Sequence, residues 1–287
     1  MPTHESTIRT SPPQEPTCIH AYLRTCKTNP QPPGLADFLR GTMALHQLCR
    51  AFGYSLKVDS SIHPLFRFLE PHPGFVALPA GEPVHEFLPT PHSCNYDVIH
   101  GGLLNMFRSG QSFNTITNSF YRNAQTGALE NWGAIDPACR EFMRSLLRPN
   151  RVLRDVIHAL HLPDRYRVIH LRFGDRFLNE GAFDARKMEY AYSRIRRIMQ
   201  QLPQERFVLL SDSAVTALKL KDRVPELTYW NSRKTHLGDL KNSDGGVQDT
   251  LADFFVLSRA SALHCTGWSG FSAVASVVFD LPRFVDF

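Results

Sequence analysis

The stretch YRVIHL (Tyr166–Leu171) decides the fold class, because it begins the most regular alternation of strands and helices in the sequence. It is a nearly continuous apolar run, followed by a basic helical pattern over residues 185–201 and by a second apolar run, RFVLL (Arg206–Leu210). The alternation continues with expected helices over 214–222, 247–259 and Phe271–Phe279, and expected strands at Leu227–Trp230, Ala262–Cys265 and Arg283–Phe287. Apolar strands between amphipathic helices predict a parallel sheet covered on both faces.

The first half of the chain shows the same alternation in a weaker form. A short strand is expected within residues 18–25, followed by a proline-rich loop. Apolar residues then recur at three- and four-residue steps from Leu35 to Phe52, which predicts a helix that ends at Gly53. Tyr54–Asp59 predicts the next strand, so these elements form a βαβ unit.

The rest of the first half is less regular. We expect loops and short turns over the proline-rich residues 60–95, a third strand at Tyr96–His100, and helix over residues 136–160 with a break at Pro149. Arg140, Arg144 and Arg148 lie on one stripe of that helix, and their spacing predicts a solvated face.

The length of the chain, 287 residues, fits two domains or one large α/β unit. We expect a polar tail over 1–17, a first Rossmann-like domain over 18–162 and a second over 163–287, with the boundary at Leu162-Pro163-Asp164. The net charge is +5, and 25 Arg stand against seven Lys. Because a guanidinium can bind two oxygens of a phosphate at once, phosphate-bearing ligands suit this composition.

Several classes of protein are not expected. Residues 1–17 lack the apolar stretch of a signal peptide and no run of about 18 apolar residues occurs, so we expect a soluble, cytoplasmic protein without a membrane span. The sequence has no Asp-x-Asp and no H-E-x-x-H, so no metal site is predicted. It has no dense Lys/Arg tract with interleaved aromatics, so nucleic acid is not expected as the main partner. Reduced cysteines are expected, with a Cys18–Cys26 bridge left open.

Ligands of doubly wound sheets bind at the carboxyl ends of the strands. Arg172 leaves the strand Tyr166–Leu171 at such an end, where an anion would offset the cost of burying its charge. Gly174 allows close approach of a ligand to the backbone. Asp175 instead allows a purely structural Arg–Asp pair that ties the loop together, and both interpretations stay open.

Two later strand ends also carry polar residues. Asp212 follows RFVLL and could accept hydrogen bonds from a ribose or a base, or could cap the next helix together with Ser211. Residues 266–272 bring glycines and hydroxyls to a helix N-terminus, which could bind an anion or form only an N-cap and tight turn. Ser269 lies in a near match to the hydrolase elbow, but no His follows it, so a serine hydrolase is not expected.

These residues lie in a recognisable order. VIHLRFGD (Val168–Asp175) resembles the H-x-R-x-G-D motif of the fucosyltransferase superfamily, which includes α1,2-, α1,6- and protein O-fucosyltransferases. The stretches that follow in the order of that family are SDS (Ser211–Ser213), DTLADFFVLSRASAL (Asp249–Leu263) and SGFSAVAS (Ser269–Ser276). Residues 32–59 also look like the first glycine loop and helix of the family.

The resemblance implies a GT-B architecture of two Rossmann-like domains that face a cleft, and an inverting reaction that needs neither metal nor cofactor. It implies that Arg172 grips the donor diphosphate and stabilises it as leaving group. The other residues that it assigns to the donor are Gly34, His170, Gly174, Asp175, Asp212, Asp253, Ser269, Gly270, Phe271 and Ser272. Asp37 is the candidate catalytic base, although a first-turn acidic residue is also favoured by the helix dipole alone.

The leading hypothesis is therefore a glycosyltransferase that moves fucose from GDP-fucose to a glycan or protein acceptor. A second hypothesis keeps the scaffold and changes the donor, for example to UDP-xylose, because fold does not fix function. A third is a catalytically silent protein that only binds a glycan or nucleotide. Without a membrane anchor, an enzyme of this kind would suit a bacterial, algal or large-virus system that glycosylates in the cytoplasm.

Overall fold

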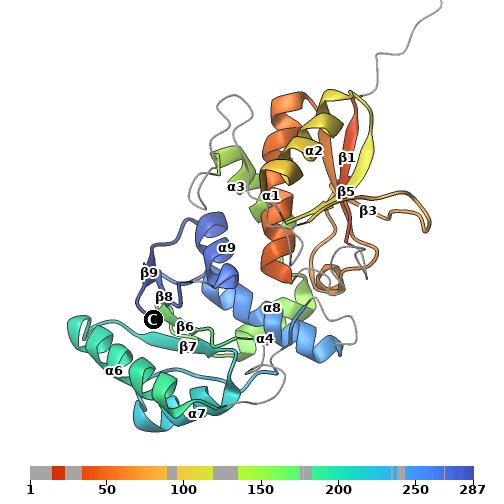
Figure 1. Ribbon diagram of the computed structural model, residues 1–287. Helices are drawn as coiled ribbons and strands as arrows, with labels where there is room; N and C mark the ends of the chain where they lie inside the picture. The colour runs from red at the N-terminus through yellow and green to blue at the C-terminus, as the bar shows by residue number, and fades with distance from the viewer. Residues whose placement is uncertain are drawn as a thin grey trace, which may run out of the picture.

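Two parallel β-sheets with helices packed around them make up the computed structural model (Figure 1). In Figure 1 the first sheet lies at the top with α1 and α2, the second lies at the lower left with α6 and α7, and α8 and α9 lie between them. The structure describes residues 15–22, 34–88, 96–118, 135–174, 177, 183–233, 235–237, 243–267 and 269–287.

The first sheet has the strand order β3-β2-β1-β5-β4, and all its pairs are parallel. Its strands are β1 (Thr17–His20), β2 (Ser55–Asp59), β3 (Phe75–Val76), β4 (His85–Phe87) and β5 (Phe113–Thr117). Helix α1 (Leu35–Phe52) connects β1 to β2 and ends at Gly53, whose φ of 70° is left-handed. The predicted βαβ unit is thus confirmed. Cys18 is a free, buried thiol, and Cys26 lies outside the described residues.

The predicted strand at Tyr96–His100 is wrong, because these residues form the first part of helix α2 (Tyr96–Arg108). The run YDVIH resembles a strand because it is short and contains two β-branched residues. The helix is revealed by the burial of His100, Leu103 and Phe107, which share one helical face. The proline-rich residues 60–88, predicted as loops, contain a 3₁₀ helix η1 (Pro64–Phe68) as well as β3 and β4.

The second sheet agrees with the sequence pattern. Its order is β7-β6-β8-β9, again all parallel, with β6 (Arg167–Leu171), β7 (Phe207–Ser211), β8 (Ala262–Cys265) and β9 (Arg283–Val285). Its helices are α6 (Ala185–Gln201), α7 (Ala214–Arg223), α8 (Asp244–Ser258) and α9 (Gly270–Phe279). Leu227–Trp230 contributes only an isolated bridge, between Val208 and Thr228.

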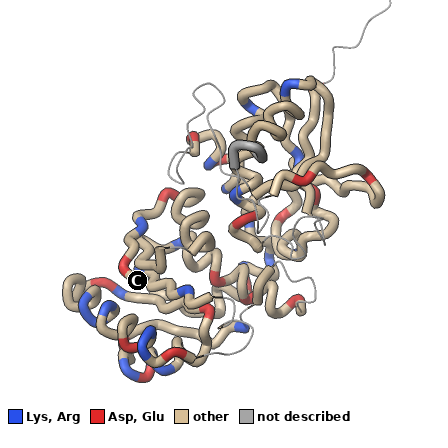
Figure 2. Tube along the Cα trace, viewed as in Figure 1, with Lys and Arg blue, Asp and Glu red and all other residues tan. Residues whose placement is uncertain are grey.

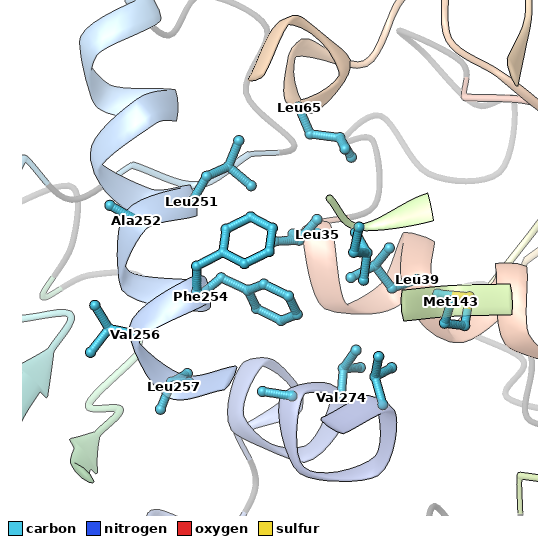
Figure 3. Packing of buried hydrophobic residues seen from close by; sticks show 14 of the residues in the cluster. Leu35, Leu39, Leu65, Met143, Leu251, Ala252, Phe254, Val256, Leu257 and Val274 are labelled. Atoms are coloured by element: carbon cyan, nitrogen blue, oxygen red, sulfur yellow. The ribbon is translucent and has the colours of Figure 1, made fainter. Parts of the chain in front are cut away.

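One hydrophobic core is shared by both halves of the chain. Leu35, Leu39 and Met143 pack in it with Leu251, Phe254 and Val274 of the second half (Figure 3). Helices α3 (Pro137–Leu146) and α4 (Arg151–Ala159) precede the predicted boundary but pack on α9 and α8. Because these helices contact the second half, their packing does not mark a boundary at residue 162, which stays a prediction.

A solvated face was predicted for Arg140 and Arg144, but both side chains also bind the backbone of α9. Arg140 Nε donates to the carbonyl of Val277 at 3.1 Å, and Arg144 Nε donates to that of Val278 at 2.8 Å. These carbonyls lie in the last turn of α9, where the helix dipole favours positive charge. Arg148 is exposed, as expected. Arg140 and Arg144 thus bind α3 to the C-terminal end of α9.

Several other arginines are exposed on the second half, among them Arg186, Arg197 and Arg223. Figure 2 shows basic residues gathered on α6 and α7, with acidic residues between them. Arg196 pairs with Glu226 and Arg223 pairs with Glu189 there. None of the helices in the described part of the chain combines the length and apolar character that a membrane crossing needs.

Gly41 lies where α1 packs directly against the backbone of β5. A Cβ at this position would lie 1.7 Å from the carbonyl oxygen of Thr117. We expect Gly41→Ala to lower the free energy of unfolding by about 2–3 kcal/mol or more, because the backbone of β5 must move. Urea denaturation measures this. Gly101→Ala in α2 is the matched control, since no atom lies within 4 Å of its Cβ position and alanine favours helix. Equal stability of both variants would contradict the close approach.

Candidate functional site

A cavity of about 490 Å³ lies between the two halves, at the carboxyl ends of the second sheet. Residues from α1, α8, α9 and the loops after β6, β7 and β8 line it. The predicted site residues found in its wall are Gly34, Asp37, His170, Arg172, Asp212, Asp253, Ser269, Gly270 and Phe271. Candidates that are up to 237 positions apart in the sequence thus meet at one cavity.

The N-termini of α1 and α9 both face this cavity. Gly34 and Ser269 are their N-cap residues; Gly34 has no side chain, and the Ser269 side chain forms no cap hydrogen bond. Helices α3, α4, α6, α7 and α8 differ, because each begins with an Asp, Asn or Ser that accepts a backbone N–H. A Cβ on Gly270 would lie 3.2 Å from the Cβ of Ala36, so the two helix ends touch. Their N–H groups and dipoles favour an anion between them.

Asp212 organises the loop that carries Arg172. Its carboxylate accepts the N–H of Phe173 at 2.9 Å and that of Gly174 at 2.9 Å, and lies 3.4 Å from Arg172 Nη1. Burial raises the pKa of Asp212 above its ordinary value, whereas these N–H groups and the Arg172 guanidinium lower it. Gly174 has a φ of 119°, which favours glycine.

Capping by Ser211 or Asp212 is wrong, because Ser213 is the N-cap of α7 and accepts the N–H of Thr216 at 3.2 Å. Asp212 pairs with Arg172 in the way that the sequence suggested for Asp175, which lies outside the described residues. Gly174 does not line the cavity and acts through the turn that it allows.

The loop after β8 connects Arg172 to α9. Thr266 Oγ1 accepts the backbone N–H of Arg172 at 3.0 Å, and the Thr266 carbonyl accepts that of Ser269 at 3.2 Å. Ser269 Oγ lies 3.4 Å from His170 Nδ1. Ser272, a predicted ligand contact, is fully buried and does not line the cavity; its hydroxyl donates to the Ser269 carbonyl. Ser272 therefore stabilises the first turn of α9.

Polar groups from α1 and α8 complete the wall. Asp253 is buried, and Ser232 Oγ donates to its carboxylate at 3.4 Å. Asp37 is 44% exposed and pairs with Arg40 at 2.8 Å. Arg40 also donates from Nε to the carbonyl of Asn118 at 2.5 Å. Within the described residues, no group of three His, Cys, Asp or Glu side chains is placed to hold a metal ion.

Sequence reasoning missed three charged or titratable residues of the wall: Arg40, His236 and Arg283. Arg40 had a local signal, because it lies one turn after Asp37 on the same helix. His236 packs so closely on Gly34 that a Cβ there would lie 2.9 Å from its Nε2. Neither His236 nor Arg283 belongs to a motif, so no local pattern points to either residue.

The arrangement of the two sheets around this cavity is a known one. Two parallel sheets with helices around a shared cavity agree with the GT-B arrangement that the resemblance implies. No family model matches the sequence, and no curated protein matches it. Solved structures with a similar fold, by contrast, match nearly the whole chain.

Three solved structures illustrate the similarity. NodZ α-1,6-fucosyltransferase co-crystallised with GDP has a TM-score of 0.60 at 18% identity, over 96% of this chain and 95% of that one. A NodZ fucosyltransferase from Bradyrhizobium gives 0.56 at 14% identity, over 92% and 93%. FUT1 of Arabidopsis thaliana, in complex with GDP, gives 0.60 at 12% identity, over 96% and 71%. The chain has a fucosyltransferase-like fold, as the resemblance predicted.

Asp212→Ala tests the organisation of the Arg172 loop. The N–H groups of Phe173 and Gly174 lose their acceptor, so we expect the free energy of unfolding to fall by at least about 2 kcal/mol. Asp155→Ala is the control, because that exposed carboxylate forms only a 3.8 Å pair with Arg151 and should cost less than about 0.5 kcal/mol. Chemical denaturation compares them, and an equal small effect would show that Asp212 does not hold the loop.

Proposed function

We propose that this chain is a glycosyltransferase that binds a nucleotide sugar in the cavity, with GDP-fucose as the donor. The observation that carries the proposal is the meeting of two helix N-termini without side-chain caps and Arg172 at one cavity. Such an arrangement suits a diphosphate. The fold supports it further, since NodZ and FUT1 structures of the same fold contain GDP.

Arg172 would stabilise the leaving group. When the bond between the sugar and the diphosphate breaks, negative charge grows on the terminal phosphate. Arg172 lies beside the N-terminus of α9, and its loop is held by Asp212 and Thr266 before any ligand arrives. Fixed donors aimed at a developing charge lower the barrier without reorganisation. The protein would thereby supply the positive charge that other transferases take from a metal.

Asp253 favours guanine as the base. Its buried carboxylate can accept two parallel hydrogen bonds, and the Watson–Crick edge of guanine offers two neighbouring N–H groups. Uracil offers one N–H at that edge, so it would leave an oxygen of the carboxylate without that partner. His170 and Phe271, whose rings lie 5.8 Å apart, are proposed to pack on the nucleotide. UDP-xylose remains the alternative donor.

Inversion requires attack on the face of the sugar opposite the diphosphate. An acceptor hydroxyl, on a glycan or a protein, would form the new bond to the anomeric carbon as the bond to the phosphate breaks. Its proton would pass to Asp37, the proposed base, which lies in the wall on α1 and is held by Arg40.

Donor identity can be tested by thermal shift with GDP, GDP-fucose, UDP and UDP-xylose. We expect GDP and GDP-fucose to raise the melting temperature, because a ligand at 100 times its Kd stabilises by about 2.7 kcal/mol. A rise with UDP compounds alone would transfer the proposal to the alternative donor. No rise with any of the four would contradict a nucleotide-sugar site.

Arg172→Gln separates an enzyme from a silent binding protein. We expect it to lower the rate of fucose transfer from GDP-fucose by about a hundredfold or more, because the negatively charged leaving group loses the positive charge that stabilises it. Arg196→Gln is the control, since Arg196 forms a 3.4 Å pair with Glu226 away from the cavity. If wild type binds the donor but neither hydrolyses nor transfers it, the chain is a binding protein. Transfer that survives in Arg172→Gln would show that Arg172 is structural.

A further inference from the structure

Arg283 is a guanidinium in the cavity wall, and its hydrogen bonds to the described residues go to neutral acceptors. Its Nε donates to Cys265 Sγ at 3.2 Å and its Nη2 donates to the carbonyl of Gly267 at 2.9 Å. The other arginines of the wall differ, because Arg40 pairs with Asp37 and Arg172 pairs with Asp212. Within the described part of the chain, no carboxylate forms an ion pair with Arg283.

Arg172 and Arg283 come from the two strands on either side of β8. Strand β8 lies between β6 and β9, so Arg172 follows the strand on one side of β8 and Arg283 belongs to the strand on the other. Neighbouring strands lie about 4.8 Å apart, which separates the backbones of β6 and β9 by about 10 Å. Along the strands, Arg283 is level with Val168, four residues before Arg172, and its side chain covers this offset by extending to the carbonyl of Gly267. Arg172 and Arg283 therefore both line the cavity.

The loop after β8 is held between these two residues. The backbone N–H of Arg172 donates to Thr266 Oγ1, and the side chain of Arg283 donates to the next carbonyl, that of Gly267. Arg283 itself pairs with Leu263, whereas its side chain donates to Cys265 and Gly267. The side chain therefore runs along β8 toward the carboxyl end of the sheet. A Cβ on Gly267 would lie 2.9 Å from Val285 Cγ1, which shows how closely the loop lies over β9. The N-terminus of α9 begins three residues later.

From this geometry we propose that Arg283 is a second diphosphate-binding residue, which contacts the phosphates from the side opposite Arg172. This inference rests on the proposed function. A guanidinium without a carboxylate partner at a cavity wall is an anion site that needs no rearrangement of an existing ion pair. The departing diphosphate carries one more negative charge than the sugar ester, so this contact strengthens as the donor bond breaks.

The test compares GDP with guanosine, because only GDP carries the phosphates. We expect Arg283→Gln to weaken GDP binding by about tenfold to a hundredfold in calorimetric titration, the usual range for a lost hydrogen bond to a charged group. Guanosine binding should stay unchanged. Arg283→Lys keeps the charge and should recover part of the GDP affinity; it also serves if the glutamine variant does not fold.

Arg194→Gln is the matched control. Arg194 is also partly buried and donates to a backbone carbonyl, that of Asp286 at 2.8 Å, but it does not line the cavity. Its GDP affinity should equal that of wild type. If Arg283→Gln binds GDP as tightly as wild type, or loses guanosine and GDP equally, Arg283 only positions the loop and the inference is wrong. If wild type itself binds no GDP, the proposed function fails instead.

Discussion

Contact between the N-terminal ends of α1 and α9 is the constraint on which the cavity depends. Ala36 and Gly270 lie so close that a Cβ on the glycine would be 3.2 Å from that of the alanine. The shared hydrophobic core brings the two helices together, and Arg140 and Arg144 hold the other end of α9. Both helices therefore present their N–H groups to one space. Their missing side-chain caps cost stability in each helix, which an anion bound between them would offset.

Charge in the wall is arranged around a small number of fixed contacts. Asp212 is buried, and it holds both the backbone after β6 and the guanidinium of Arg172. A carboxylate so close to the proposed phosphate position would repel the ligand if it faced the ligand directly. Its oxygens instead accept hydrogen bonds from the N–H groups of Phe173 and Gly174 and pair with Arg172. The negative charge of Asp212 is therefore offset within the loop. Three of the 25 arginines, Arg40, Arg172 and Arg283, are among the described residues that line the cavity, so most of the arginine surplus lies away from it.

Much of the second sheet could be predicted from the sequence, because β6, β7 and β8 are mostly apolar and buried and α6 is amphipathic. The first sheet was harder. Strands β3 and β4 have only two and three residues, too few to show a period, and Tyr96–His100 has a strand-like composition inside a helix. Tertiary packing of Leu103 and Phe107 decides that helix.

The site divides in the same way. Arg172 and Ser269 were found because each follows a clear strand and belongs to a motif. Arg283 could not be found, since its place in the wall depends on the register of β9 against β8. The role of Arg140 and Arg144 was also hidden, because their acceptors lie more than 130 positions away in the sequence. Contacts between distant segments leave no local pattern.

A crystal structure of the chain with GDP tests the central claim most directly. We expect the diphosphate at the N-terminus of α9, within hydrogen-bond distance of the N–H groups of Gly270 or Phe271 and of the Arg172 guanidinium, with the base toward Asp253. A diphosphate bound elsewhere, with the α1 and α9 N-termini facing only solvent, would contradict it.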